Sequence, residues 1–226
     1  MPRRSLILAS AVLAAGAVST PALAGALSSS IGGDPSTYGT IAIAFEGPLT
    51  GSQASNGQDM LRGVQLAVRE YNAKGGFAGR KVQIVQANDK ADPSIAKAVA
   101  KKAIKAGITA VVGPYNSSVG IVNLPTYIGA KVVPVHMTSS DDTTGLGVTV
   151  QPKNSQISPV EFDYISKIWK PSKVSMLVDP SAYTQSMADR LKASLEKQGV
   201  LVTQVPITEG QASYAAQVNQ AKVNAT

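Results

Sequence analysis

Apolar positions follow two alternating periods along this chain. Short runs rich in β-branched residues, such as Ile41–Phe45, have the length and composition of buried strands. Between them, apolar residues recur at helical spacing, as Leu61, Val64 and Val68 do within a helix expected over Gln58–Lys74. Helices that alternate with strands form crossovers between parallel strands, so the pattern predicts an α/β fold: a parallel sheet with helices on both faces.

The alternation runs in two blocks that meet near residues 149–155. The further elements expected in the first block are strands at Val82–Gln86, Thr109–Gly113 and Lys131–Val135, and helices over Pro93–Lys105 and from Ser117 or Ser118 to Gly129. Those expected in the second are a connecting strand at Val148–Pro152, helices over Gln156–Trp169, Gln185–Gln198 and Tyr214–Val223, and strands at Val174–Val178 and Val200–Val205. No strand follows the last helix. We therefore expect an N-terminal lobe over 39–148 and a partial second lobe over 149–226.

The N-terminus has the pattern of a secretory signal. Arg3 and Arg4 precede an apolar run over Leu6–Val18, and Ala22-Leu23-Ala24 supplies a small-residue cleavage site. The run is short for a membrane span. We expect residues 1–24 to be a signal peptide cleaved after Ala24, residues 25–38 to be a flexible Ser/Gly-rich leader, and the mature protein to be soluble and periplasmic.

Composition excludes several classes of function. The chain has no cysteine, which removes disulfides, thiolate metal sites and a cysteine nucleophile. Its 21 basic and 14 acidic residues are scattered, which indicates a solvated surface and no nucleic-acid partner. There is one histidine, His136, at a strand end, where a packed residue is the usual reading. We expect no enzyme activity, no metal and no cofactor.

One motif is more specific than the rest. Residues Tyr71–Val82, read as Y-N-A-K-G-G-F-A-G-R-K-V, join a helix end to a glycine-rich turn and a strand. Gly75 is placed to end the helix, and Gly76 and Gly79 free the turn from side-chain clashes. This sequence motif resembles one found in the branched-chain amino-acid-binding proteins of ABC transporters. Asn72–Val82 is the strongest part of a resemblance that covers about residues 39–226.

The resemblance implies a type I periplasmic-binding-protein fold whose second lobe is incomplete. Such proteins trap an amino acid or related amide between two lobes and deliver it to a membrane permease; we expect a monomer. Members of the family continue beyond this chain's end, and their acidic partner for the ligand ammonium lies there. Two alternatives stay open: a truncated, binding-incompetent fragment, and an exported ligand-sensing lobe for a receptor.

Ligands of parallel α/β sheets bind beyond the carboxyl ends of the strands. The loop before Ser117 and Ser118 joins a strand end to a helix start, where free N–H groups favour a carboxylate. An ordinary serine N-cap is the alternative. The resemblance places the carboxylate-binding serine at Ser117, with Ser118 adjacent.

Two further loops complete the predicted site. The resemblance implies ligand contacts at Ser139 and at Ser140 or Asp141, and a ring from the second lobe at Tyr183. The alternatives are a solvated polar loop and a tyrosine that packs on its own helix. Asn56 replaces the family's aromatic residue, which suggests a different ligand side chain. The predicted ligand-binding residues are Ser117, Ser118, Ser139, Ser140 and Tyr183; we read Asp89 and Asp92 as a turn and a cap.

Overall fold

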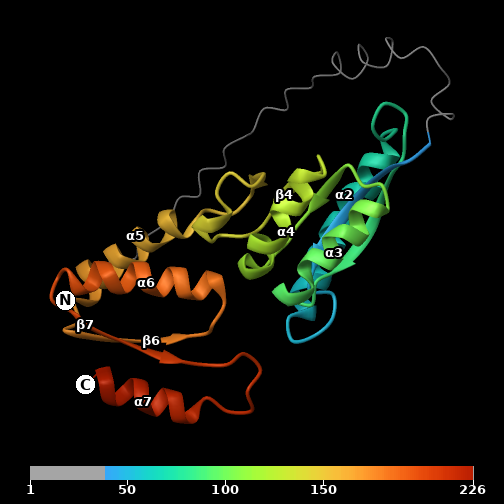
Figure 1. Cartoon of the computed structure of the whole chain (residues 1–226). Helices are drawn as coiled ribbons and strands as arrows, with labels where there is room; N and C mark the ends of the chain where they lie inside the picture. The colour runs from blue at the N-terminus through green and yellow to red at the C-terminus, as the bar shows by residue number, and fades with distance from the viewer. Residues whose placement is uncertain (1–38, 226) are drawn as a thin grey trace, which may run out of the picture.

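The computed structural model describes residues 39–225, which form two separate parallel sheets with helices packed on them (Figure 1). The predicted signal peptide, its cleavage site and the leader lie outside the described residues. We call the five-stranded sheet with its helices the first lobe, and the two-stranded sheet with its helices the second lobe. Between the last strand of the first sheet and the first helix of the second lobe, the chain crosses from one lobe to the other through residues 150–153.

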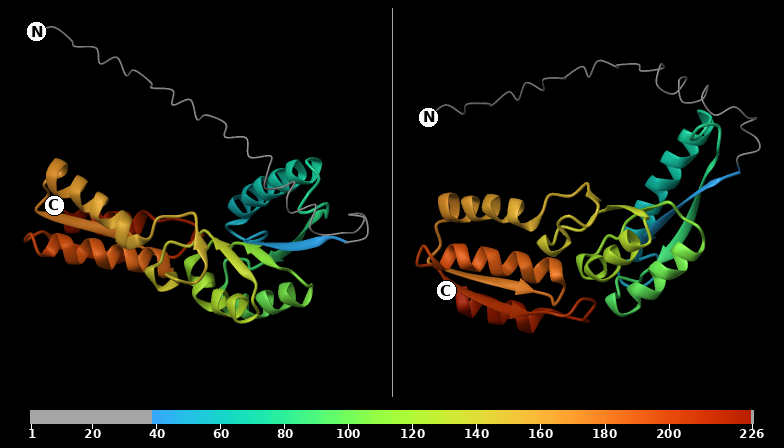
Figure 2. Two further views of the ribbon diagram at one scale, coloured as in Figure 1. Left: turned by 90° about the horizontal axis from the view of Figure 1, so that it is seen from above. Right: turned by 45° about the horizontal axis from the view of Figure 1, so that its top comes forward.

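The first lobe confirms the predicted parallel sheet covered on both faces. Its strands, in spatial order, are β2 (Val82–Asn88), β1 (Ile41–Gly47), β3 (Ala110–Val112), β4 (Val133–His136) and β5 (Val148–Thr149). Its helices are α2 (Ala54–Ala73), α3 (Pro93–Lys105) and α4 (Ser117–Gly129). Figure 2 shows α2 on one face and α3 with α4 on the other. Right-handed crossovers require helices on opposite faces here, because the chain moves from β1 to one side, to β2, and then returns to the other side of β1, to β3 and β4.

Asn72–Val82, the motif on which the resemblance rests, links α2 to β2 through hydrogen bonds, and we call this link the clamp. The Asn72 side chain donates to the Val82 carbonyl (2.7 Å) and accepts from the Val82 N–H (2.8 Å). Gly76 has φ of +71°, and a Cβ there would meet the Arg80 carbonyl oxygen at 2.1 Å. Only glycine fits at this position, so the turn returns the chain to the sheet in one fixed direction.

Two apolar clusters hold the helices against the first sheet. The cluster beneath α3 and α4 contains Ala44, Val111 and Tyr127, none of them exposed. The cluster beneath α2 is smaller and centres on Phe45 and Leu61. Because α2 is the one helix on its face among the described residues, a groove of about 890 Å³ remains between it and the sheet; its lining includes Ile41, Ile43, Val64, Val68, Tyr71, Phe77 and Val112.

The second lobe is a small three-layer unit. Its elements are α5 (Asn154–Tyr164), a π-helical turn (Ile165–Trp169), β6 (Lys173–Val178), α6 (Ala182–Glu196), β7 (Leu201–Pro206) and α7 (Ala215–Ala225). Figure 1 shows α6 and α7 on opposite faces of the β6–β7 pair. Leu195 and Val205 are fully buried between these layers. None of the helices within residues 39–225 combines the length and apolarity that crossing a membrane requires.

Several predicted boundaries were wrong; helix α6, for example, begins at Ala182 instead of Gln185, with Ser181 as its N-cap. Helix α2 begins at Ala54 instead of Gln58, and its first turn lies against Pro48, where a Cβ on Gly57 would be 2.1 Å from the Pro48 carbonyl oxygen. Strand β5 stops at Thr149, whose hydroxyl accepts the Gln151 N–H. Helix α5 starts at Asn154, ahead of Gln156.

The early start of α5 comes from a side chain that reaches back along the chain. The Gln156 side-chain oxygen accepts the Lys153 N–H at 2.8 Å, which is half of a capping box.

The division into lobes at residues 148 and 149 stays a prediction; β5, which ends at Thr149, pairs with β4 in the first sheet.

Candidate functional site

A cleft of about 430 Å³ lies between the two lobes. It opens where the rule for parallel sheets places ligands, beyond the carboxyl ends of strands and at helix starts. Its lining from the first lobe and the connection is Gln53, Asn56, Tyr115, Asn116, Ser117, Ser118, Met137, Ser139 and Gln151. Its lining from the second lobe is Ile157, Asp179, Ser181, Tyr183, Thr184 and Glu209.

Ser117 brings together the two predicted serine loops. It is almost fully buried, at 4% exposed, and its Oγ accepts the N–H groups of Ser139 (3.3 Å) and Ser140 (3.1 Å). Both contacts use the hydroxyl as an acceptor, so its proton stays available for an anion. Three of the predicted site residues therefore converge at one point. The side chain of Ser140 serves its own loop, since its Oγ accepts the Asp142 N–H.

The start of α4 supplies further donors at the same point. Its N-cap residue is Asn116, whose side chain makes no capping hydrogen bond, and Ser117 occupies the first helical position. The alternative of Ser117 as an ordinary N-cap is therefore excluded. N–H groups of an uncapped first turn, together with the helix dipole, favour a carboxylate.

Ser118 connects the lobes, and Tyr183 lines the cleft from the second lobe. The Ser118 Oγ accepts the Ala182 N–H at 2.9 Å, across the cleft, at the first residue of α6. Asn154 donates to the Tyr183 carbonyl at 3.0 Å. The Tyr183 residue is 44% exposed and lines the cleft.

Asp179 is held by two hydrogen bonds, one from its own loop and one from the first turn of α6. Its carboxylate accepts the Ser181 N–H and the Thr184 hydroxyl, each at 2.7 Å. Burial opposes ionisation of this side chain, but the hydrogen bonds from Ser181 and Thr184 outweigh it and lower the Asp179 pKa. Thr184 therefore helps to keep Asp179 negatively charged.

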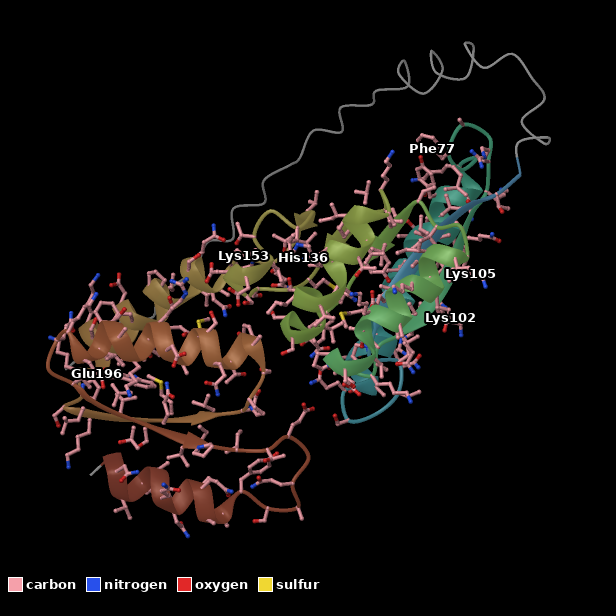
Figure 3. All side chains as sticks on the ribbon, viewed as in Figure 1. Phe77, Lys102, Lys105, His136, Lys153 and Glu196 are labelled. Carbon is pink, nitrogen blue, oxygen red and sulfur yellow. The ribbon has the colours of Figure 1, made fainter. Side chains whose placement is uncertain are left out.

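Sequence reasoning missed Lys153, which fixes the loop after β4. Its Nζ donates to Thr143 Oγ1 (2.6 Å) and to the carbonyls of Thr138 (3.3 Å) and Ser140 (3.4 Å). Figure 3 shows it beside His136, where the connection between the lobes leaves the first sheet. This loop presents the N–H groups that donate to Ser117, so Lys153 helps to hold those N–H groups in position. A lone lysine in a connection has no periodic signal that would have revealed this.

His136 is a packed residue, as expected. It is 1% exposed, and its Nδ1 lies 2.8 Å from the Thr138 hydroxyl. Burial, together with a smaller effect of the nearby Lys153 charge, lowers its pKa to about 4. The ring is therefore neutral at neutral pH. Asp92 accepts the Ser94 N–H at the start of α3, and Asp89 accepts the Ala91 N–H, which confirms their reading as a cap and a turn.

Charge in the cleft lining is exclusively negative. Asp179 and Glu209 are its two carboxylates, and none of its residues is Lys or Arg. Glu209, which no motif or periodic pattern singles out, accepts a hydrogen bond from the Gln53 side chain at 2.9 Å. Within residues 39–225, no group of three or more His, Asp or Glu side chains is arranged to hold a metal ion. The cleft thus offers anion-binding N–H groups on one side and two carboxylates on the other.

Comparison with known proteins agrees with this architecture. The periplasmic binding protein family matches residues 40–225, and the chain belongs to that family. It is 32% identical over 197 residues to a Leu/Ile/Val-binding protein homolog of Brucella abortus, covering 83% of this chain and 53% of the relative. It is 32% identical over 209 residues to an amino acid binding protein of Pseudomonas aeruginosa, covering 89% of this chain and 56% of the relative.

Solved structures show the same fold. The substrate-binding protein LivJ of a branched-chain amino acid transporter from Streptococcus pneumoniae, in complex with isoleucine, matches with a TM-score of 0.71 and 25% identity over 81% of this chain and 54% of that one. The leucine binding protein LivK of Thermotoga maritima matches with a TM-score of 0.72 and 20% identity over 81% of this chain and 53% of that one. The chain spans about half the length of the relatives it matches. These are binding proteins and not enzymes, which confirms the expectation of no enzyme activity.

Proposed function

We propose that this protein is the substrate-binding component of an ABC transporter, which captures an amino acid or related amide and delivers it to a membrane permease. It does so after export to the periplasm and cleavage behind Ala24, as a monomer. The family, and relatives named for amino-acid binding, support this role. Residues 39–148 and 149–226 act as the two lobes that close on the ligand.

In this proposal the ligand carboxylate binds at the start of α4. Ser117 donates its hydroxyl proton to it, and the first-turn N–H groups of α4, Ser118 included, add to the anion site. Ser139 and Ser140 hold the Ser117 hydroxyl in place through their N–H groups. The Tyr183 ring, at the start of α6, covers the ligand from the second lobe.

The ligand ammonium pairs with the carboxylates on the other side. Asp179 and Glu209 face the same cleft, and the hydrogen bonds to Asp179 keep it ionised. A zwitterion needs both of its charges paired once water leaves the cleft, because an unpaired buried charge is costly. The observation that carries the proposal is this opposition of the Ser117 anion site and two carboxylates across one cleft.

Calorimetry on Ser117→Ala tests the proposal. Loss of a hydrogen bond to a charged group costs roughly 1.5–3 kcal/mol, so the affinity for an amino acid should fall at least about tenfold. Ser194→Ala is the matched control, because the Ser194 hydroxyl donates to a carbonyl within α6, outside the cleft lining. An unchanged affinity in Ser117→Ala, or an equal loss in the control, would contradict the assignment.

A further inference from the structure

Side-chain carboxamides gather on the first-lobe wall of the cleft. Four of the lining residues carry them, on the loop and first turn of α2, the loop before α4, and the connection between the lobes: Gln53, Asn56, Asn116 and Gln151. Aliphatic or thioether side chains in the lining are confined to Met137 and Ile157. This composition is unlike a pocket for an aliphatic group, which is lined predominantly by apolar residues.

A chain of hydrogen bonds fixes which way two of these amides point. The Glu209 carboxylate only accepts, so Gln53 must direct its NH₂ group to it, at 2.9 Å. The Gln53 oxygen then accepts the NH₂ group of Asn116, at 2.8 Å. Asn116 is left with its Oδ1, which is shielded from solvent and accepts no hydrogen bond from any residue in the described part of the chain. Glu209, at the acidic end of this series of hydrogen bonds, thus fixes both amides so that Asn116 Oδ1 is an acceptor without a donor.

The other two amides are free to match a ligand. Asn56 and Gln151 are exposed at the cleft, and neither side-chain amide is hydrogen-bonded within residues 39–225. Each offers NH₂ donors and an oxygen acceptor. Together with Asn116, they suit a neutral ligand group that both donates and accepts.

We propose that the cleft selects amino acids with a carboxamide side chain over branched aliphatic ones, an inference that rests on the proposed function. A carboxamide NH₂ group supplies the donor that Asn116 Oδ1 lacks, and its oxygen accepts from Asn56 or Gln151. A leucine-like side chain desolvates these amides without replacing their hydrogen bonds with water, and sites built for polar groups reject such analogues strongly. A carboxylate side chain meets the Asn116 oxygen and the negative charges of Asp179 and Glu209.

Calorimetric titration of the whole chain with four amino acids tests this selectivity. L-Glutamine and L-glutamate have nearly the same shape and differ in the terminal group, L-leucine is aliphatic, and L-arginine probes attraction to the carboxylates. We expect L-glutamine to bind at least tenfold more tightly than each of the other three. Asn116→Leu should reduce the preference for glutamine over leucine at least tenfold, and Asn56→Leu should reduce it in the same direction.

The controls separate selectivity from folding and from the proposed function. Asn56 is exposed, so its substitution leaves folding intact even if Asn116→Leu disturbs the start of α4; Asn219→Leu, on the exposed side of α7, should change nothing. Binding of leucine, glutamate or arginine as tight as glutamine overturns the inference while the proposed function stands. An unchanged preference in both cleft variants also overturns it. No binding of any amino acid overturns the proposed function, and the inference with it.

Discussion

Glu46 gives the first lobe a specific dependence on pH. The Glu46 side chain is fully buried where β1 faces α4, and its Oε1 accepts from Asn123 at 2.5 Å. Its surroundings raise its pKa from 4.5 to about 8: burial has the largest effect, the Asp89 charge adds to the rise, and the nearby Tyr127 hydroxyl and Asn123 amide oppose it. Glu46 is therefore largely protonated in the folded protein at neutral pH.

The sign of the effect follows from the raised pKa. A group that holds its proton more tightly in the folded state contributes stability that is complete below pH 4.5 and is lost as pH rises through about 8. Each pKa unit corresponds to about 1.4 kcal/mol, so the Glu46 contribution to the free energy of unfolding falls by about 3 kcal/mol between pH 5 and pH 8. Glu46→Gln keeps the shape of the neutral acid but does not titrate, so it should lose this dependence.

Urea unfolding of both proteins at pH 5 and pH 8 measures the difference. Asp89, whose pKa is raised to about 6 by burial, and His136, whose pKa is lowered, titrate in both proteins, so their contributions largely cancel between them. Glu46→Gln should gain about 3 kcal/mol relative to the native sequence on going from pH 5 to pH 8. Glu161→Gln, at an exposed position of α5, is the control. Parallel pH profiles for the native sequence and Glu46→Gln would refute the reasoning.

Three further variants test the supports of the site and the fold. Lys153→Met should release the loop after β4, weaken amino-acid binding roughly tenfold and speed hydrogen exchange there, because three contacts to the loop are lost; unchanged exchange would exclude the positioning role. Asn72→Ala should lower the free energy of unfolding by about 1–3 kcal/mol through loss of both bonds to Val82, measured in urea, and a change within 0.5 kcal/mol of zero, about that of a surface substitution, would contradict the clamp. Ser118→Ala should broaden the spin-label distance distribution between the lobes, because the bond to Ala182 is lost; an unaltered distribution would show that this bond does not restrain them.

Local pattern was enough to predict the order of elements and to expect a cleft at the strand ends, where the structure has one. Ser117 and Ser139 converge because parallel strands deliver their loops to one edge, a rule that needs no coordinates. Lys153 and Glu209 could not be found this way. Their partners lie in other loops, and contacts between polar residues distant in sequence leave no periodic trace. The start of α2 was missed because its N-cap residue, Gln53, is not a typical capping residue and its side chain makes no capping hydrogen bond.

The loop that carries Ser139 and Ser140 is attached to the second lobe as well as to the first. Asp141 accepts the Ser155 hydroxyl at the start of α5 and pairs with Arg190 of α6 at 2.8 Å. Any rotation of α5 and α6 therefore displaces the loop, so an optical probe on the loop would report movement of the second lobe. The next residue, Asp142, is exposed, and the chain contains no cysteine. Asp142→Cys would provide a unique attachment point for an environment-sensitive dye, so that ligand capture could be recorded as a fluorescence signal from a single labelled position.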